Sequence, residues 1–376
     1  MAVYKVTFTP SGPYFFGNEK TFGYPGQTVG GKLNNRYFIR GEALPSQTTL
    51  LGALRYLLLP LKGYGNLDKE VNIEAVGKGS YRIDAGEVQN FGRIKKLSPL
   101  FLMNGKEIFV PTPLDHNCDQ PRYTEVKENG KPKLIDGKPE RIDYYTPFQN
   151  YTRLTTSDGE KLYTEDFNVK AGVTDSFVSL TDLHLEDDLF SSEVRVGILC
   201  RSTEEGFFKK EYRVLKNGYS FAVFAEIDGE SLDGRCEIVS LGQGKVPFRV
   251  RFEACADGEG DLAAMAETKL GSVKHPEPTY YCLGDLFLDT VNYDEFYTGR
   301  LRFAVTKTKE FRNFRTQKGG RIEKSPELYR LIRAGSVFLP AERVDGAGDV
   351  TALAEQTVNQ KNAGQIGWNR IIKIGG

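Results

Sequence analysis

The chain has 376 residues, and its 50 lysines and arginines balance 50 aspartates and glutamates, so the formal net charge is zero. This length allows two domains with cores of their own, and the charge balance excludes a global positive field that would attract nucleic acid without selectivity. Five scattered cysteines without a C-x-x-C pair argue for reduced thiols in a cytoplasmic protein. We expect neither a signal peptide nor a membrane-spanning segment, because no apolar run is long enough.

The first elements are a strand and a helix. Residues 3–9 alternate apolar and polar side chains and predict a strand, which a loop rich in glycine and aromatic residues follows. A helix is predicted from Ser46, which can cap the first turn, to the residue before Pro60. Gly52 and Arg55 lie on a different face of this helix from its leucines, so Gly52 either packs against a strand or lets a ligand approach closely.

The middle of the chain predicts paired strands, an insertion and a further strand. Residues 97–102 and 107–110 flank Asn104-Gly105, a dipeptide typical of a tight hairpin turn. Residues 113–180 are polar and rich in turn signals, which predicts an insertion with one or two protruding hairpins. The acidic residues 180–190 predict a helix, and the alternation that follows predicts a strand over residues 194–198.

The second half repeats this style and predicts an α+β fold with antiparallel sheets. Parallel crossovers would need more helices than the pattern offers. We interpret this repetition as a duplicated ferredoxin-like half. The expected elements are strands at 219–227, 248–252, about 280, 301–305, 336–339 and up to 374, with a helix at 261–270.

No residue pattern supports a catalytic or metal site. His116, His184 and His275 are far apart, and none lies near a spaced cysteine pair. The acidic residues around Asp182 lack the alternating oxygen ligands of a calcium loop, so we interpret them as a solvated or ion-paired face. Residues 242–245 lack the spacing of a phosphate-binding P-loop and predict a strand connection. We therefore expect no catalytic residue, no metal and no cofactor.

The basic side chains concentrate in residues 307–333, where nine lysines and arginines face three glutamates. Phe311 and Phe314 alternate there with Arg312 and Arg315, which offers cations for phosphates and rings for base stacking. A solvated basic loop is an equally good interpretation from the sequence.

Glycines gather again near the C-terminus, in residues 362–370. Gly364 and Gly367 expose backbone N–H groups that can approach a phosphate, and Arg370 can supply charge. A plain turn before a final strand is the alternative, with Trp368 as a core anchor.

Several blocks form a combined pattern over nearly the whole chain. The blocks are Pro-Tyr-Phe-Phe-Gly at 13–17, Pro-Ser-Gln-Thr-Thr-Leu-Leu-Gly-Ala-Leu-Arg at 45–55, Pro-Leu-Phe-Leu and Val-Pro-Thr-Pro-Leu-Asp within 99–115, Glu-Val-Arg-Val-Gly-Ile at 193–198, Leu-Gly-Gln-Gly-Lys at 241–245, Ala-Gly-Ser-Val-Phe at 334–338, and the terminal glycine segment. Taken together, they resemble the RAMP superfamily, and within it the family of third subunits of the type III-B CRISPR effector, the Cmr complex.

The resemblance implies two fused ferredoxin-like, RNA-recognition-type domains, which we place at 1–205, with the hairpin insertion, and at 206–376. It implies a non-catalytic subunit that holds the 5′ handle of the CRISPR RNA and joins a large polymerase-palm-like subunit to the backbone nuclease subunit. It also implies that the hairpin lies near the target RNA. The aromatic strand signature of ordinary RNA-recognition modules is absent from the sequence, so stacking on a central strand is not expected.

Our hypothesis is that the start of the 46–59 helix, the aromatic loop and the terminal glycine segment converge on the handle backbone. An endonuclease of the same superfamily, using a histidine as general base, and a scaffold that contacts only proteins are the alternatives. For Arg55 and Arg195, pairing with acidic residues of the sheet is an equally good interpretation as RNA binding. The expected RNA-binding residues are Phe15, Phe16, Ser46, Gln47, Thr48, Arg55, Arg195, Arg312, Arg315, Gly364, Gly367 and Arg370.

Overall fold

The computed structural model divides the chain into two compact units, each assembled from three segments. The first unit comprises residues 1–106, 188–260 and 310–330, and the second comprises 107–187, 261–309 and 331–376. The sequence division was a single cut after residue 205. The structure describes residues 1–17, 28–29, 32–33, 37–114, 123–125, 127–128, 131–132, 134–135, 138–139, 141–143, 176–201, 204–256, 258–271, 279–289, 296, 301–316, 322–340 and 350–374.

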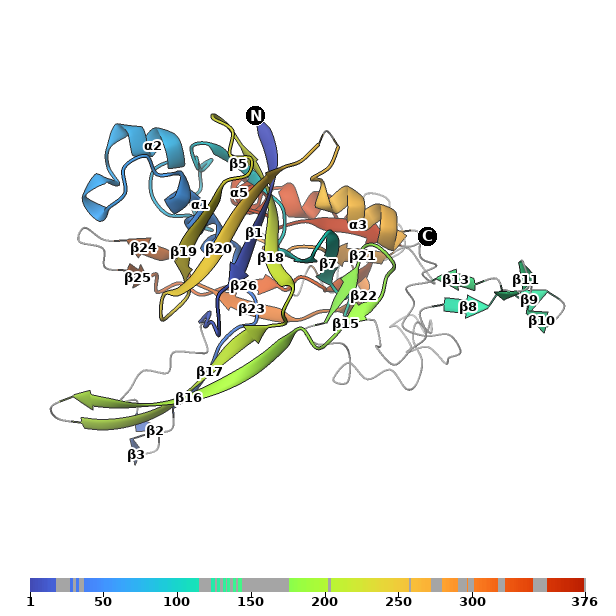
Figure 1. Ribbon diagram of the computed structural model, residues 1–376, viewed down its shortest axis with the longest axis horizontal. Helices are drawn as coiled ribbons and strands as arrows, with labels where there is room; N and C mark the ends of the chain where they lie inside the picture. The colour runs from blue at the N-terminus through green and yellow to red at the C-terminus, as the bar shows by residue number, and fades with distance from the viewer. Residues whose placement is uncertain are drawn as a thin grey trace. The chain divides into compact units, whose positions relative to one another are not determined.

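An antiparallel sheet forms the framework of the first unit (Figure 1). Its strands lie in the order β6-β18-β1-β20-β19, and β5 pairs with β18. The central strand β1 and the strands at 219–227 and 248–252 confirm the predicted alternation. The strands are β1 (Ala2–Pro10), β5 (Ile94–Leu97), β6 (Phe101–Asn104), β18 (Tyr219–Ile227), β19 (Cys236–Leu241) and β20 (Val246–Ala254).

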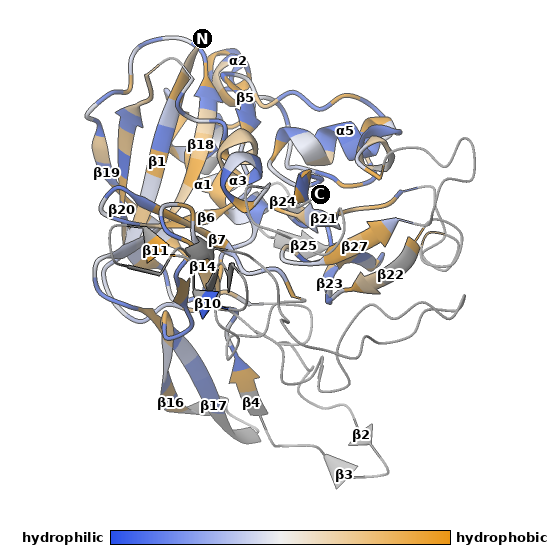
Figure 2. Ribbon diagram, turned by 90° about the vertical axis from the view of Figure 1, so that its right-hand side faces the viewer, coloured by the Kyte–Doolittle hydropathy of each residue, from blue (hydrophilic) through white to orange (hydrophobic). Residues whose placement is uncertain are grey.

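The sheet has one apolar and one polar face because side chains alternate along each strand. On β1, Val6 and Phe8 are fully buried, whereas Lys5, Thr7 and Thr9 are half-buried on the opposite face. Figure 2 shows the same alternation of hydrophobic and hydrophilic residues along these strands. The apolar face is therefore core, and the polar face is open to solvent.

Helix α1 (Gln47–Leu58) contacts β19 and contributes its leucines to the core. Ser46 caps it as predicted, since its Oγ accepts a hydrogen bond from the Thr49 N–H at 3.2 Å. Gly52 is exposed, and no described atom lies within 4 Å of a Cβ placed on it. The interpretation that Gly52 packs against a strand is therefore wrong. The short helices η2 (Tyr64–Asn66) and α2 (Glu70–Val76) follow.

A long two-stranded ribbon leaves the sheet region of the first unit (Figure 1). Its strands β16 (Phe190–Arg201) and β17 (Glu204–Leu215) pair antiparallel, and β4 (Tyr37–Arg40) adds to β17 in parallel. The predicted strand over 194–198 is confirmed. The unit also holds the pairs β2 (Thr28–Val29) with β3 (Lys32–Leu33) and β24 (Phe314–Thr316) with β25 (Ile322–Lys324).

The second unit contains a four-stranded antiparallel sheet in the order β22-β27-β21-β28 and three further strands that pair in the order β15-β14-β7. Helix α3 packs on β28. The predicted strands and the helix at 261–270 are confirmed. The elements are β7 (Glu107–Pro111), β14 (Phe177–Ser179), β15 (Leu185–Glu186), α3 (Leu262–Gly271), β21 (Thr279–Cys282), β22 (Leu301–Val305), β27 (Val337–Pro340), η3 (Ala352–Glu355), α5 (Val358–Gln365) and β28 (Ile371–Ile374). Strands β23 (Thr308–Phe311) and β26 (Tyr329–Ile332) lie where the chain passes between the units.

Within the predicted insertion, the structure describes residues 113–114, six short stretches between 123 and 143, and residues 176–180. Three short antiparallel pairs occur there: β8 (Tyr123–Glu125) with β13 (Arg141–Asp143), β9 (Lys127–Glu128) with β10 (Lys131–Pro132), and β11 (Leu134–Ile135) with β12 (Lys138–Pro139). Residues 144–175 lie outside the described part of the chain.

The predicted helix over 180–190 is wrong. Leu183 adopts a positive φ of 65°, and Asp182 accepts a hydrogen bond from the His184 N–H at 3.1 Å, so a turn interrupts the segment before β15. Short-range hydrogen bonds of aspartate favour such turns over helix. The α+β class with antiparallel sheets is otherwise confirmed, while the ferredoxin-like duplication stays a prediction. None of the described helices is long and apolar enough to cross a membrane.

Candidate nucleic-acid interface

Two cations and two aromatic rings meet on the two-stranded ribbon β16–β17 of the first unit. Arg195 on β16 lies directly opposite Lys210 on β17. The Arg195 Cζ lies 4.6 Å and the Lys210 Nζ 4.8 Å from the centroid of the Tyr212 ring. The same Lys210 Nζ lies 3.9 Å from the centroid of Phe15. We call Phe15, Arg195, Lys210, Tyr212 and Gln243 the cation–ring cluster.

The glycine loop between β19 and β20 holds this cluster together. Gln243 donates its backbone N–H to the Phe15 carbonyl at 3.0 Å and accepts a hydrogen bond from Lys210 Nζ at 2.9 Å. At Gly242, φ is +71° and a Cβ would lie 2.4 Å from the Phe15 carbonyl oxygen. Only glycine allows this approach. The segment is the strand connection that the sequence predicted, and it also positions a lysine.

The charges of the cluster are only partly compensated. Like charges directly opposite on paired strands repel each other. Arg195 donates to Glu193 at 2.7 Å, and this hydrogen bond raises the pKa of Arg195 above its ordinary value. Lys210 is only 7 % exposed, and burial lowers the pKa of Lys210. A phosphate beside the exposed Arg195 and the half-buried Tyr212 would relieve the repulsion, and the ring offers a surface for a base.

Helix α1 contributes less to a binding site than the sequence predicted. Ser46 Oγ contacts Thr48 Oγ1 at 3.0 Å, and both residues are half-buried. Gln47 is 4 % exposed and donates its side-chain amide to the Ser98 carbonyl, so its side chain serves the core. The start of the helix therefore offers hydroxyl groups and backbone donors only.

Arg55 is a structural residue. Its Nε donates to the Val76 carbonyl at 2.7 Å and its Nη2 to the Gly77 carbonyl at 3.1 Å, so it binds the C-terminal end of α2. Burial lowers the pKa of Arg55 to about 10, and the group stays charged at neutral pH. The sequence left two roles open for Arg55, RNA binding and a structural role. The hydrogen bonds to Val76 and Gly77 favour the structural role.

The aromatic loop does not offer free rings. Phe15 is fully buried and Phe16 is 5 % exposed, and Phe16 packs among Tyr14, Phe221 and Phe248. The buried Phe15 ring nevertheless packs against the Lys210 ammonium group. Phe15 therefore helps to position Lys210 but does not itself contact a ligand.

The basic segment is anchored to the loop after α2. Asn313 is 1 % exposed, accepts the Ile83 N–H at 2.9 Å and donates to Asp84 at 2.8 Å. Partial burial acts to raise the pKa of Asp84, but hydrogen bonds from Arg82 and Tyr329 outweigh it, and the pKa lies below its ordinary value.

In the same segment, the Arg312 guanidinium donates to the carbonyls of Ser325 and Pro326. Arg315 lies three residues further along the chain, on β24, and its side chain is outside the described part. The anchoring of 310–330 to the loop after α2 fixes where this basic hairpin begins.

The terminal glycine segment differs from its prediction. Gly364 lies in the last turn of α5, which begins with a capping box at Thr357, and Gly367 follows the helix. The backbone N–H groups of residues 366–369 all donate within the unit, to the carbonyls of Ala363, Gly364 and Asp285. The C-terminal end of a helix also repels anions. These backbone N–H groups are therefore already engaged within the unit, and Trp368, 1 % exposed, belongs to the core.

Arg370 lies 3.8 Å from Glu355. The predicted RNA-binding residues fall into both units, since Gly364, Gly367 and Arg370 belong to the second and the others to the first. Of the predicted set, the cluster contains Phe15 and Arg195.

The sequence reasoning missed Lys210, Tyr212 and Gln243. Lys210 and Tyr212 have strand spacing i and i+2, which places them on one face of β17. Their partners across the ribbon depend on a register that only the fold reveals.

A separate group of ligand atoms was also missed. Oxygen or nitrogen atoms of Glu107, Asp182 and His184 in the second unit lie within 4.8 Å of one another. His184 Nδ1 contacts Asp182 and lies 3.5 Å from Glu107. These contacts among the three side chains agree with the interpretation of the residues around Asp182 as a solvated or paired face.

Comparison with known proteins identifies the class as CRISPR-associated. A family model described as "CRISPR-associated protein (Cas_Cmr3)" matches residues 6–275. The chain belongs to this family. No curated protein matches it.

Solved structures with a similar chain include "Cryo-EM structure of the Type III-B Cmr-beta bound to cognate target RNA", with 13 % identity, a TM-score of 0.44, and coverage of 89 % of this chain and 86 % of that one. They also include "Crystal structure of Csm3-Csm4 subcomplex in the type III-A CRISPR-Cas interference complex", with 12 % identity, a TM-score of 0.35, and coverage of 89 % and 92 %.

Proposed function

We propose that this chain is a non-catalytic, RNA-binding subunit of a type III-B CRISPR effector. In this role it holds the 5′ handle of the CRISPR RNA and joins the large polymerase-palm-like subunit to the backbone nuclease subunit. The observation that carries the proposal is the cation–ring cluster, in a chain that belongs to the Cas_Cmr3 family.

The chemistry of the cluster suits a single-stranded RNA end. Arg195 can bind a phosphate through two of its N–H groups, and the Tyr212 ring can stack on an unpaired base. The buried Lys210 adds positive potential without reaching the ligand. Because the whole chain is neutral, the attraction is local to this ribbon, and the proposal requires no general affinity for nucleic acid.

An endonuclease is the second candidate, and histidine placement argues against it. A general base must lie within hydrogen-bond reach of the ribose hydroxyl. The cation–ring cluster contains no histidine, and the described His184 is engaged by Asp182 in the other unit. His116 and His275 lie outside the described residues.

The full chain should bind a labelled RNA with the handle sequence, with an affinity that falls as salt rises, and should leave the RNA uncut. For single-stranded RNA the slope of log K against log salt is about −0.7 per phosphate contact. A filter-binding titration at several salt concentrations, with a gel of the recovered RNA, measures both. Absence of RNA binding would support a scaffold that contacts only proteins, and cleavage would support the nuclease.

The proposal extends to the target RNA. The polar composition and turn signals of residues 113–180 motivate the expectation that this insertion lies beside the guide–target duplex and interrupts its pairing. Deleting residues 123–143 in the reconstituted effector should then move or abolish at least one target cleavage position. Unchanged positions and rates on a sequencing gel would remove this role.

A further inference from the structure

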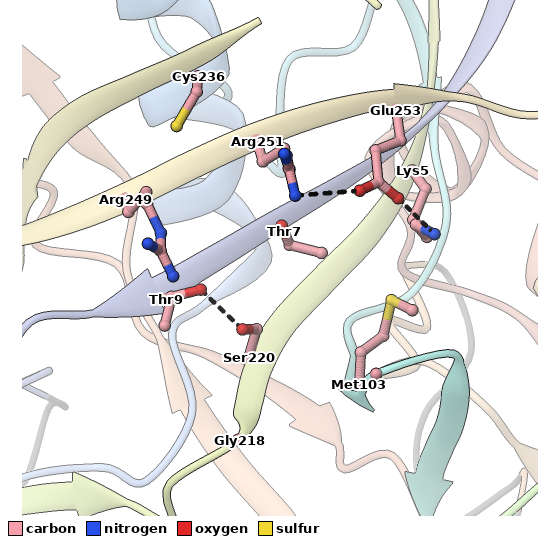
Figure 3. Close-up of a pocket in the computed structure, with 11 residues that line it drawn as sticks. Lys5, Thr7, Thr9, Met103, Gly218, Ser220, Cys236, Arg249, Arg251 and Glu253 are labelled. Carbon is pink, nitrogen blue, oxygen red and sulfur yellow. Dashed lines mark hydrogen bonds and ion pairs between the residues drawn. The ribbon is translucent and has the colours of Figure 1, made fainter. Parts of the chain in front are cut away.

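We propose that the polar face of the first unit's sheet carries a second binding site, for phosphate groups. A cavity of about 310 Å³ lies on this face, across strands β1, β18, β20 and β19 and the turn after β6 (Figure 3). The candidate site is distinct from the cation–ring cluster, with which it shares no residue. Its lining is basic and hydroxyl-rich.

The strand register explains why these side chains gather. Arg251 pairs with Thr7 and Arg249 with Thr9, so two arginines face two threonines across β20 and β1. Since side chains alternate, all four point to the face opposite the core. On the other side of β1, Thr9 Oγ1 lies 2.7 Å from Ser220 Oγ, which places a third hydroxyl in the same row.

The charge balance of the cavity favours an anion. Lys5, Arg249 and Arg251 contribute three positive charges against one negative charge from Glu253, which leaves two positive charges. Glu253 lies 2.6 Å from Lys5 Nζ and 3.7 Å from Arg251 Nη1, so it engages two of the cations (Figure 3). Among the described residues, Arg249 has no ion-pair partner, and it is exposed.

The lining defines the chemical class of the ligand. Arginine forks bind phosphate oxygens through paired hydrogen bonds, and hydroxyls can donate to the same oxygens. None of the described residues that line the cavity is aromatic, so this lining offers no platform for base stacking. The chemistry therefore fits phosphate esters, and the row of two arginines along one strand fits consecutive phosphates of a single-stranded nucleic acid without base readout.

Cys236 provides a local probe of this site. It lines the cavity and is an exposed free thiol, whereas Cys255 is half-buried and Cys282 fully buried. A ligand in the cavity should slow alkylation of Cys236 by iodoacetamide. Mass spectrometry of the Cys236 peptide reports ligand binding in this cavity and not at the cation–ring cluster. The two binding proposals are therefore tested independently, and a negative result for one does not contradict the other.

The experiment titrates the full chain with an oligouridine 15-mer and follows Cys236 alkylation. We expect at least 3-fold protection at saturation. The double variant R249E/R251E should weaken the midpoint of protection at least 10-fold. The control K69E/K78E makes the same charge change at two exposed lysines outside this face, and it should leave the midpoint within 2-fold.

The variant Glu253→Gln gives a result that a purely structural role would not give. It removes the competing carboxylate and should tighten the midpoint about 3-fold, because Lys5 and Arg251 become free to bind phosphate. Parallel titrations with ATP and with inorganic phosphate identify the source. Protection by the oligonucleotide alone assigns a strand, and equal protection by ATP assigns a free nucleotide. Absence of protection by all three ligands, or equal weakening by both double variants, would overturn the proposal.

Discussion

Replacing Arg55 with alanine is expected to lower the free energy of unfolding by about 2–4 kcal/mol while leaving RNA affinity per folded molecule unchanged. The guanidinium donates to the carbonyls of Val76 and Gly77. Its removal leaves both carbonyl oxygens without these hydrogen bonds and leaves a cavity where the side chain was. Chemical denaturation followed by circular dichroism measures the loss.

The control for this prediction is Arg55→Lys, which keeps the charge but cannot make two parallel hydrogen bonds. It should lose an intermediate amount of stability. If Arg55→Ala were fully stable and bound handle RNA more weakly, Arg55 would be an RNA contact after all, and the structural assignment would be wrong.

Reversing the charge of Arg195 is expected to weaken handle-RNA binding at least 10-fold with little effect on folding. Arg195 is exposed, its side chain being 50 % accessible, and its ion pair with Glu193 adds little to stability. In the variant Arg195→Glu, a carboxylate would lie beside Glu193 where the phosphate should bind, so the effect on binding is repulsion as well as loss of a donor. Fluorescence anisotropy at 0.1 M salt measures the affinity.

Lys209→Glu is the matched control for Arg195→Glu. Lys209 lies on the same ribbon and is exposed, but strand alternation places it on the other face from Lys210. Its reversal changes the net charge equally and should cost less than 3-fold in affinity. Equal losses for the two variants would mean that the RNA responds to overall charge and that the cation–ring cluster is no site.

The sequence predicts the framework of the fold because that framework depends on local periodicity. The alternation on β1, β18 and β20 and the capping of α1 by Ser46 each follow from side-chain pattern within one element. The terminal glycine segment was misjudged for a physical reason. Glycine near a chain end signals either a loop or the end of a helix, and the capping box at Thr357, which starts α5, decides between them.

The site was predictable only in part. Arg195 and Phe15 are separated by 180 residues in the sequence, and they come together because Lys210 lies between them on a strand whose register is set by tertiary pairing. For Arg55 the sequence left RNA binding and a structural role as equal alternatives, because its partners, the carbonyls of Val76 and Gly77, belong to a different element. Cross-strand and cross-element partners are not encoded in local spacing.

The central claim is that the cation–ring cluster binds the 5′ handle of the guide RNA. Photocrosslinking tests this claim most directly. The reconstituted effector would carry a CRISPR RNA with 4-thiouridine in its 5′ handle, and the crosslinked peptides of this chain would be sequenced by mass spectrometry. We expect adducts on peptides that contain Arg195, Tyr212 or Gln243, and their loss in the Arg195→Glu variant. Adducts confined to other subunits, or to peptides of this chain remote from the ribbon, would contradict the account.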